Sequence, residues 1–266
     1  MRVLFLANRF PYPPYRGDKL KIYNLAKRLS KKHELILLTF IQDRKDYEHL
    51  PELKKIFSKV SLVDLPYYRS AANCLGGLFS GDPLQICYFR SGRMKERLNE
   101  IMRNENIDII HTQHLRMSQY TCDLSNMRRI LDLPDAYSLY WKRRIEMKGS
   151  PARRAFARSE YMKVLRYEDV IRKFDMTLVC SEEDREHLKK VHGADNIGIL
   201  HNGVDTDTFN SEWHVYENSS SIVFSGNMGY YPNIDAARYF AGEIFPEVRK
   251  RFPNVFLRIA GQNPVK

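Results

Sequence analysis

Two histidines stand in the segment IDIIHTQHLRMSQY, where a short apolar run gives way to polar residues. His111 ends the apolar run, and Gln113 and His114 follow within three residues. An imidazole can accept or donate a proton near neutral pH, so His111 and His114 are candidate general acids or bases. The alternative is that both histidines are structural. The segment supplies no third histidine, and we predict no metal site in it.

Two aspartates follow the next apolar run, in the segment LDLPDAYS. Asp132 and Asp135 flank Pro134, a residue that breaks a strand. Their carboxylates are suited to hydrogen bonds from a polyhydroxylated ligand. The alternative is that they only cap the helix that follows.

A glycine lies in the long segment that joins the first apolar run to the first amphipathic stretch, NRFPYPPYRGDKLKIYNLAKRL. Gly17 stands just before Asp18, which we expect to be a helix N-cap. The free N–H groups of a helix N-terminus, with no Cβ in the way, favour a phosphate or another anionic oxygen. Arg16 and Lys19 strengthen that interpretation. The alternative is an ordinary turn, because one glycine falls short of a phosphate-binding fingerprint.

Short apolar runs alternate with amphipathic stretches through residues 1–209, a pattern typical of strands connected by helices. Runs such as VLFLA and LILLTF are apolar almost throughout, as strands covered on both faces are. We therefore predict a Rossmann-like α/β domain, with a mostly parallel sheet and helices on both faces. The expected strands are 2–7, 35–41, 60–65, 107–111, 128–133, 176–180 and 197–200, and the expected helices are 18–30, 47–57, 84–104, 155–173 and 182–191.

The predicted strands place the candidate residues at one edge of the sheet. In open parallel sheets, ligands bind beyond the carboxyl ends of the strands. The histidines, Gln113 and the two aspartates all stand at such ends.

A polar, aperiodic stretch at 210–220, NSEWHVYENSS, indicates a linker. A new unit follows, with an expected strand at 221–225, a helix at 234–251 and a strand at 255–260. A single βαβ unit leaves most of its sheet faces open. We therefore expect 221–266 to be the incomplete start of a second domain, which would continue by on the order of 100 residues.

The composition is that of a globular protein, with 43% hydrophobic and 28% charged residues. No apolar run approaches the roughly 18 residues that a membrane span needs. The start MRVLFLANRF lacks the features of a signal peptide, so we expect a cytoplasmic protein. The four cysteines have neither metal-binding nor redox spacing, and we expect buried thiols.

The positive charge is concentrated. Eleven basic residues but only four acidic ones fall between 142 and 173, which gives this stretch +7 of the net charge of +11. Such a patch suits nucleic acid, anionic lipid or a phosphorylated substrate. The alternative is a solvated helix face. No aromatic platform and no helix-turn-helix spacing accompanies the charge, which disfavours nucleic acid.

Several motifs resemble, in order along the chain, those of family-4 retaining glycosyltransferases, which have the GT-B fold. ILHNGVDTDTF is similar to their hinge (I/V)xPNGVDxxxF, with His201 in place of the usual proline. FDMTLVCSEEDREHL is similar to FDxxxxxSexxxxxL, and DIIHTQHLRMSQY to a DxxHxHxxxx strand end, with Gln113 in place of a second histidine. PYPPYRGDKLKIYNLAKRL resembles their first glycine loop, and 222–264 resembles the opening of their C-terminal domain. The likeness extends to sugar transferases of bacterial exopolysaccharide and exosortase-associated gene sets.

The resemblance implies an acceptor-side domain at 1–209 and the start of a donor-binding domain at 221–266. It implies transfer of a hexosyl group from a nucleotide-sugar donor to a saccharide or lipid-linked acceptor, with retention, in polysaccharide biosynthesis and without a metal or other cofactor. The implied catalytic residues are His111 and His114, the donor-phosphate residues Gly17, Arg16, Gly226 and Asn227, and the acceptor-side residues Gln113, Asp132 and Asp135.

Two departures from the family pattern bear on activity. Where the family usually has an arginine and a lysine that hold the diphosphate, GNMGYYPN offers Asn227, Met228 and Asn233, so this clamp is either altered or lies beyond residue 266. The acidic ExxxxxxxE element is absent from 1–266. We therefore expect these 266 residues alone to bind the donor weakly and to be nearly inactive. Asp205 and Asp207 form a DxD pattern, but their place in the hinge motif argues against the metal-binding role that DxD has in other sugar transferases.

The resemblance also implies a binding partner for the basic stretch at 142–173. Many relatives act on lipid-linked acceptors, which implies peripheral contact with the anionic inner face of the cell membrane through Arg144, Arg153, Arg154 and Arg158. Two alternatives stay open: a nucleotide-sugar epimerase of the same fold, which needs no acceptor, and a basic module that binds nucleic acid.

Overall fold

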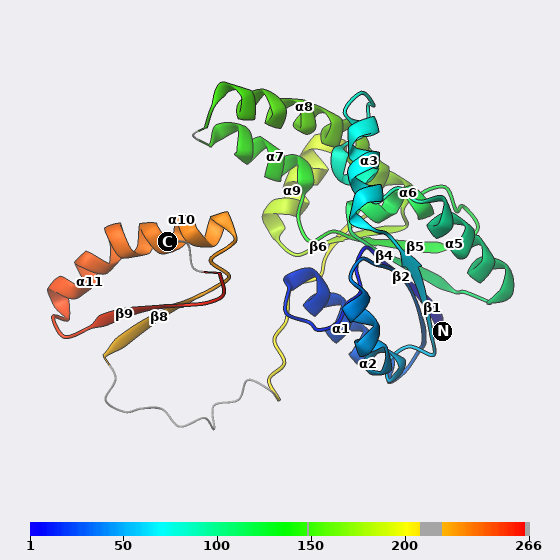
Figure 1. Cartoon of the computed structure of the whole chain (residues 1–266), viewed down its shortest axis with the longest axis horizontal. Coiled ribbons are helices and arrows are strands. Elements are labelled where there is room, and N and C mark those ends of the chain that lie inside the picture. The colour runs from blue at the N-terminus through cyan, green and yellow to red at the C-terminus, as the bar shows by residue number, and fades with distance from the viewer. Residues whose placement is uncertain (148, 208–219, 264–266) are drawn as a thin grey trace. The chain divides into compact units, whose positions relative to one another are not determined.

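The computed structural model describes residues 1–147, 149–207 and 220–263 (Figure 1). The chain forms two compact units, Met1–Gly203 and Val204–Lys266. The described part of the first unit contains a seven-stranded sheet and that of the second a two-stranded sheet. The linker predicted at 210–220 lies, except for Ser220, outside the described residues.

All seven strands of the first sheet are parallel, in the order β3-β2-β1-β4-β5-β6-β7. The strand order reverses between β1 and β4, the kind of switch point beside which open α/β sheets bind ligands. This topology confirms the Rossmann-like fold class. The strands are β1 (Arg2–Ala7), β2 (Glu34–Ile41), β3 (Lys59–Asp64), β4 (Ile109–Gln113), β5 (Arg128–Asp132), β6 (Met176–Val179) and β7 (Ile197–Ile199).

Both faces of the sheet are covered by helices. Leu4 and Leu6 of β1 pack on one side with buried residues of α5 (Gly92–Asn104). Val3 and Phe5 pack on the other side with α1 (Gly17–Leu29) and α2 (Leu50–Lys54). Successive side chains of a strand point to opposite faces, so an uninterrupted apolar run fills both cores.

Three helices of the first unit were not expected from the apolar spacing: α3 (Tyr67–Gly77), the short α6 (Ser118–Thr121) and α7 (Tyr137–Glu146). In α3 the usual pattern is inverted, because Ser70 is buried while Tyr67, Tyr68 and Leu75 are exposed. The other helices of the first unit are α4 (Leu84–Tyr88), α8 (Pro151–Glu168) and α9 (Glu182–His192).

Three predicted helices differ from the structure in extent. The single helix expected at 84–104 is two helices, since Ser91 caps α5 by accepting a hydrogen bond from Met94 N at 3.4 Å. The one expected at 47–57 is a 3₁₀ segment (Arg44–His49) followed by α2. The one expected at 155–173 starts earlier, at Pro151 behind the capping residue Ser150, and ends in a 3₁₀ segment (Asp169–Lys173).

Of the four cysteines, all free, only Cys87 is buried, and the others are half-buried, which corrects the expectation of buried thiols.

The second unit contains one βαβ motif. Its parallel strands are β8 (Ser221–Ser225) and β9 (Phe256–Ala260), and its helices are α10 (Tyr231–Tyr239), a π-helical segment (Phe240–Ile244) and α11 (Phe245–Arg251). Val223, Phe256 and Ile259 of this strand pair are exposed. The assignment of this unit to a donor-binding domain stays a prediction.

A buried carboxylate holds the start of α7. Glu168, at the end of α8, is fully buried and accepts a hydrogen bond from Tyr137 N at 2.7 Å and two from Ser138 N at 3.3 Å. His192 Nε2 lies 3.3 Å from the same carboxylate. The N-cap residue of α7, Ala136, makes no capping hydrogen bond through its side chain. Glu168 therefore accepts hydrogen bonds from the first N–H groups of α7, which have no partner within the helix.

Replacing Glu168 with alanine should lower the free energy of unfolding by about 2–4 kcal/mol, because two buried N–H groups lose their acceptor. Urea denaturation followed by circular dichroism measures the change. Glu186→Ala, on the exposed side of α9, is the control and should stay within about 0.5 kcal/mol of the parent. Equal unfolding midpoints for the two variants would contradict the assigned role.

Candidate functional site

The carboxyl ends of β1, β4 and β5 meet the first turns of α1. Gln113 Nε2, at the end of β4, donates a hydrogen bond to Asp18 O at 2.7 Å. Lys21 Nζ, one turn further along α1, donates to Asp132 Oδ1 at the end of β5, at 2.6 Å. These two contacts fix α1 over the switch point of the sheet.

His111 lies in a buried cluster with Asp132 and Lys21. Its Nε2 is 3.6 Å from Asp132 Oδ2, and its ring packs on Phe5 with 4.7 Å between ring centroids. Burial lowers the pKa of His111, the carboxylate of Asp132 opposes that shift, and the Lys21 ammonium adds to it. Burial and Lys21 thus favour the neutral form of the imidazole. Within the described residues, neither of its nitrogens has a hydrogen-bond partner.

His114 is also buried, but its ring is engaged. Its backbone adopts φ 82°, a conformation that is costly for a residue with a side chain and that is common at functional sites. Arg116 Nε donates to His114 Nδ1 at 2.9 Å, and the Tyr137 hydroxyl contacts the ring as well. Burial lowers the pKa of His114 well below its usual value, and the charges of Arg116 and Arg9 lower it further. Because arginine only donates, Nδ1 is the acceptor and the ring proton belongs on Nε2.

The glycine loop differs in one detail from the prediction. The N-cap of α1 is Arg16 and not Asp18, and Arg16 makes no capping hydrogen bond through its side chain. Asp18 lies in the first turn, where Oδ1 accepts from Lys19 N at 3.0 Å. Gly17 is exposed, and a Cβ there would meet open space. The first turn therefore leaves room for a close approach.

Asp132 and Asp135 do not cap α7, whose first N–H groups bind Glu168. Asp132 pairs with Lys21 instead. Asp135 has an exposed surface, and partial desolvation of its carboxyl group and the nearby Asp184 raise its pKa.

Gly226 and Asn227 shape the loop after β8 in the second unit. Gly226 N donates to Ala260 O at 3.0 Å, and Asn227 Oδ1 accepts from Gly229 N at 2.9 Å. A Cβ at Gly226 would lie 3.0 Å from Asn233 Nδ2.

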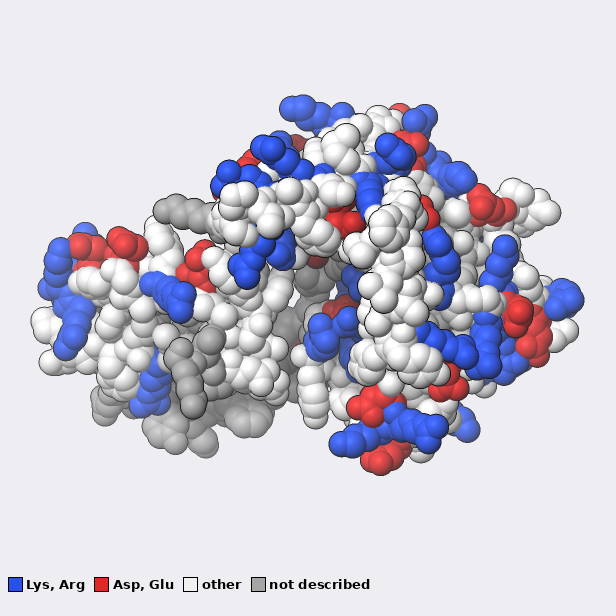
Figure 2. All heavy atoms as spheres, turned by 45° about the horizontal axis from the view of Figure 1, so that its top comes forward, with Lys and Arg blue, Asp and Glu red and all other residues white. Residues whose placement is uncertain are grey.

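The basic residues of α7 and α8 form an exposed surface (Figure 2). Arg153, Arg154 and Arg158 are exposed on α8, and the Arg144 guanidinium lies over the rings of Tyr140 and Trp141. Exposed apolar side chains accompany these charges: Phe156 and Met162 on α8, Met147 after α7, and Leu75, Leu78 and Phe79 in and after α3. No helix in the described part of the chain is both long and apolar enough to cross a bilayer.

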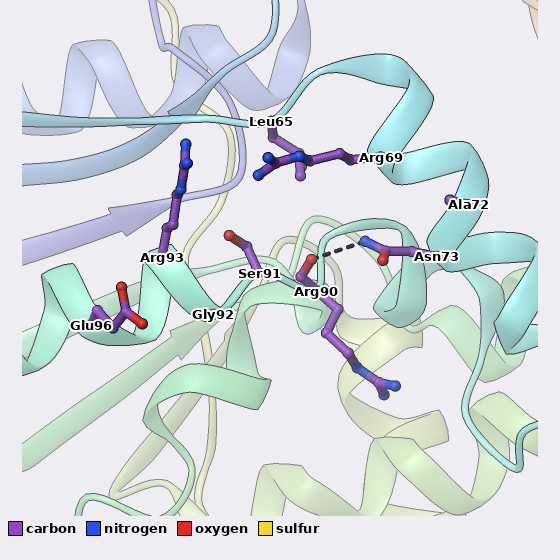
Figure 3. A pocket seen from close by; sticks show the side chains of 9 residues that line it. All are labelled: Leu65, Arg69, Ala72, Asn73, Arg90, Ser91, Gly92, Arg93 and Glu96. Carbon is purple, nitrogen blue, oxygen red and sulfur yellow. Dashed lines mark hydrogen bonds between the residues drawn. The ribbon is translucent and has the colours of Figure 1, made fainter.

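A separate open cavity of about 400 Å³ lies between α3 and the start of α5 (Figure 3). Arg69, Arg90 and Arg93 line it, together with Glu96. Arg90 extends away from the other two arginines and pairs with Asp82 at 2.5 Å. None of the predicted site residues lines this cavity.

Sequence reasoning missed Lys21, Arg9, Arg116 and Tyr137. Arg9 had a usable signal, because it follows the first apolar run at a strand end. Lys21 had none, since its partner Asp132 is 111 residues away. Among the described residues, no group of three or more histidine, cysteine, aspartate or glutamate side chains could hold a metal ion.

Solved structures with the same fold are GT-B glycosyltransferases. Sucrose-phosphate synthase from Thermosynechococcus elongatus aligns with a TM-score of 0.57 at 12% identity, over 99% of this chain and 71% of that one. A UDP-glucosyltransferase from Polygonum tinctorium aligns with a TM-score of 0.53 at 11% identity, over 97% and 70%. Phytolacca americana UGT2, complexed with UDP-2-fluoro-glucose and pterostilbene, aligns with a TM-score of 0.50 at 12% identity, over 85% and 60%.

The family follows from the sequence. The model of Glycosyltransferase Family 4 matches residues 22–208, and the chain belongs to that family. An uncharacterized 44.6 kDa protein in the cps region of Klebsiella pneumoniae is 22% identical over 98% of this chain. The chain spans 64% of that relative's length.

The buried ion pair should control the protonation of His111. Lys21→Met removes a like charge, so the pKa of His111 should rise, whereas Asp132→Asn removes the stabilising carboxylate, so the pKa should fall. Titration of the His111 ring signals by NMR measures both shifts. Lys27→Met, exposed on α1, serves as the control. Shifts of the same sign in the two variants would refute the arrangement.

Proposed function

We propose that this protein supplies the acceptor-side domain of an enzyme that transfers a hexosyl group from a nucleotide sugar to a saccharide or lipid-linked acceptor, with retention. The observation that supports the proposal is the buried His111, neither of whose nitrogens has a hydrogen-bond partner within the described residues, at the switch point of the sheet. Family membership supports the reaction class. A relative in a cps region supports a role in polysaccharide biosynthesis, and the UDP-sugar complex of the Phytolacca protein supports a nucleotide-sugar donor.

Each predicted site residue has a distinct role in the proposed reaction. His111 accepts or donates a hydrogen bond at the sugar, where an oxocarbenium-like transition state needs preorganised polar groups. The first turn of α1, at Arg16 and Gly17, presents N–H groups to the donor diphosphate. Gly226 and Asn227 contact the donor from the second domain. No metal or other cofactor takes part.

On the acceptor side, some residues hold other groups in place and others contact the acceptor. Gln113 holds α1 by its hydrogen bond to Asp18 O, and Asp132 holds Lys21 and places its carboxylate 3.6 Å from His111 Nε2. Asp135 offers its carboxyl group to an acceptor hydroxyl. His114 orients its neighbours Arg116 and Tyr137 and is the second catalytic candidate.

Changing His111 to alanine in the complete gene product should reduce turnover about 100-fold or more, the usual contribution of a positioned acid or base. The rate of nucleoside diphosphate release measures turnover, and NMR of the product shows the anomeric configuration. His114→Ala and the double variant test the second histidine, and Glu186→Ala is the control. Unchanged turnover in the double variant would refute both roles.

The same assay separates the epimerase alternative. An epimerase converts the nucleotide sugar with no acceptor present, whereas a transferase forms product only when an acceptor is added. Conversion of the sugar without release of the nucleotide would favour the epimerase.

The basic surface of α7 and α8 supports contact with an anionic membrane. Arg144, Arg153, Arg154 and Arg158 supply the charge, and the exposed Phe156 and Met162 supply apolar contacts.

Changing Arg153, Arg154 and Arg158 together to glutamine should weaken binding to anionic vesicles roughly 100-fold, at about 1 kcal/mol for each arginine. Co-sedimentation with phosphatidylglycerol vesicles at low salt measures binding. Exchange of Arg28, Arg93 and Arg103 to glutamine removes the same charge from other exposed positions and should have a smaller effect. Equal losses in the two variants would overturn a specific surface.

A further inference from the structure

Two arginines without a role in the assignments above lie around His114. Arg9 follows β1, and Arg116 follows β4 in a 3₁₀ turn (Leu115–Met117). Arg116 Nε binds His114 Nδ1, and its guanidinium lies 5.1 Å from the centre of the Phe89 ring. The charges of both arginines act on His114. Because β1 and β4 are paired neighbours, the two arginines follow the carboxyl ends of adjacent strands.

The charge of this cluster is not balanced. Burial lowers the pKa of the Arg9 guanidinium, and the like charges of Arg16 and Arg116 add to that effect. Within the described residues, the one carboxylate in ion-pair distance of these three arginines is Asp18, 3.6 Å from Arg9 Nη1. Arg9 and Arg116 are half-buried, and a buried charge is costly unless it is paired, so these two cations attract an anion.

A second observation points to a missing partner at the same edge. Asn8, between β1 and Arg9, is 1% exposed, and within the described residues neither its Oδ1 nor its Nδ2 has a hydrogen-bond partner. The nitrogens of His111 on the next strand are unpartnered too. Such groups are rare in native proteins, because a buried polar group without a hydrogen-bond partner destabilises the fold.

We propose that Arg9 and Arg116 form a subsite for a phosphate group of a substrate. Planar guanidinium groups bind phosphate through paired hydrogen bonds. Two guanidinium groups carry two positive charges, which match the double negative charge of a phosphate better than the single charge of a carboxylate. The proposed function enters only in naming the source of the phosphate, which is the donor or a lipid-linked diphosphate acceptor.

Calorimetric titration of the 266-residue chain at low salt tests the subsite, with inorganic pyrophosphate as the probe. Arg9→Gln and Arg116→Gln should each weaken pyrophosphate binding about tenfold or more, the loss expected for a charged hydrogen-bonded contact. Arg116→Lys should restore only part of the affinity, and Arg28→Gln, exposed on α1, should leave it unchanged. Losses no larger than that of Arg28→Gln would overturn the proposal.

Two further arms identify the source. If the donor occupies the subsite, the variants lose affinity for UDP; if a lipid-linked diphosphate does, they lose affinity for farnesyl diphosphate. Should a variant not fold, the unmodified chain still decides the matter, because pyrophosphate must shift the guanidinium NMR signals of Arg9 and Arg116. Absent shifts would refute the subsite. Glycosyl transfer is measured separately, so failure here leaves the proposed function standing.

Discussion

The ion pair between Lys21 and Asp132 is the contact on which the carboxyl edge of the sheet depends. It joins the helix after β1 to the strand beyond β4, across the point where the strand order reverses. Both side chains are largely withdrawn from water, with 12% and 3% of their surfaces exposed. Removing one partner of such a pair leaves a buried charge uncompensated, at a cost of about 3–5 kcal/mol. The pair therefore fixes the start of α1 and the electrostatic surroundings of His111 together.

The two histidines have separate environments, although only three positions separate them. Both are buried, but His114 is held by Arg116 and Tyr137, whereas neither nitrogen of His111 has a hydrogen-bond partner within the described residues. The difference in hydrogen bonding between the two histidines depends in part on residues outside the sheet. Glu168 fixes the start of α7, and Tyr137 is the first residue of that helix. A carboxylate at the end of α8 thus helps to orient a ring at the end of β4.

Much of the fold could be predicted because its strands are short and apolar on both faces. All seven strands of the first sheet were expected within about two residues of their ends. The inverted helix α3 was missed, since a helix that buries Ser70 and exposes tyrosines shows no apolar stripe. The helix at 84–104 was predicted too long, because a serine in a polar stretch does not reveal whether it caps.

The candidate site could be predicted only in part. A residue at the end of an apolar run, such as His111 or Asp132, stands at the functional edge by topology alone. Lys21 and Glu168 act through partners that the chain brings close only after folding, and no local pattern announces them. Which of the two histidines lacks hydrogen-bond partners depends on arginine and tyrosine contacts that one sequence does not reveal.

The central position of β1 has a consequence for how the chain acquires its structure. β1 emerges first in synthesis, and β2 and β3 can pair beside it early. The other neighbour of β1 is β4, which begins 107 residues later in the sequence. A hydrogen bond from Arg2 N to Asp108 Oδ2 joins the starts of these two strands. Pairing of parallel strands that are distant in sequence is slow, because the entropy of loop closure is lost before the stabilising contacts form. The nascent chain therefore carries an unpaired apolar strand edge until β4 arrives, the interval in which it is most exposed to aggregation.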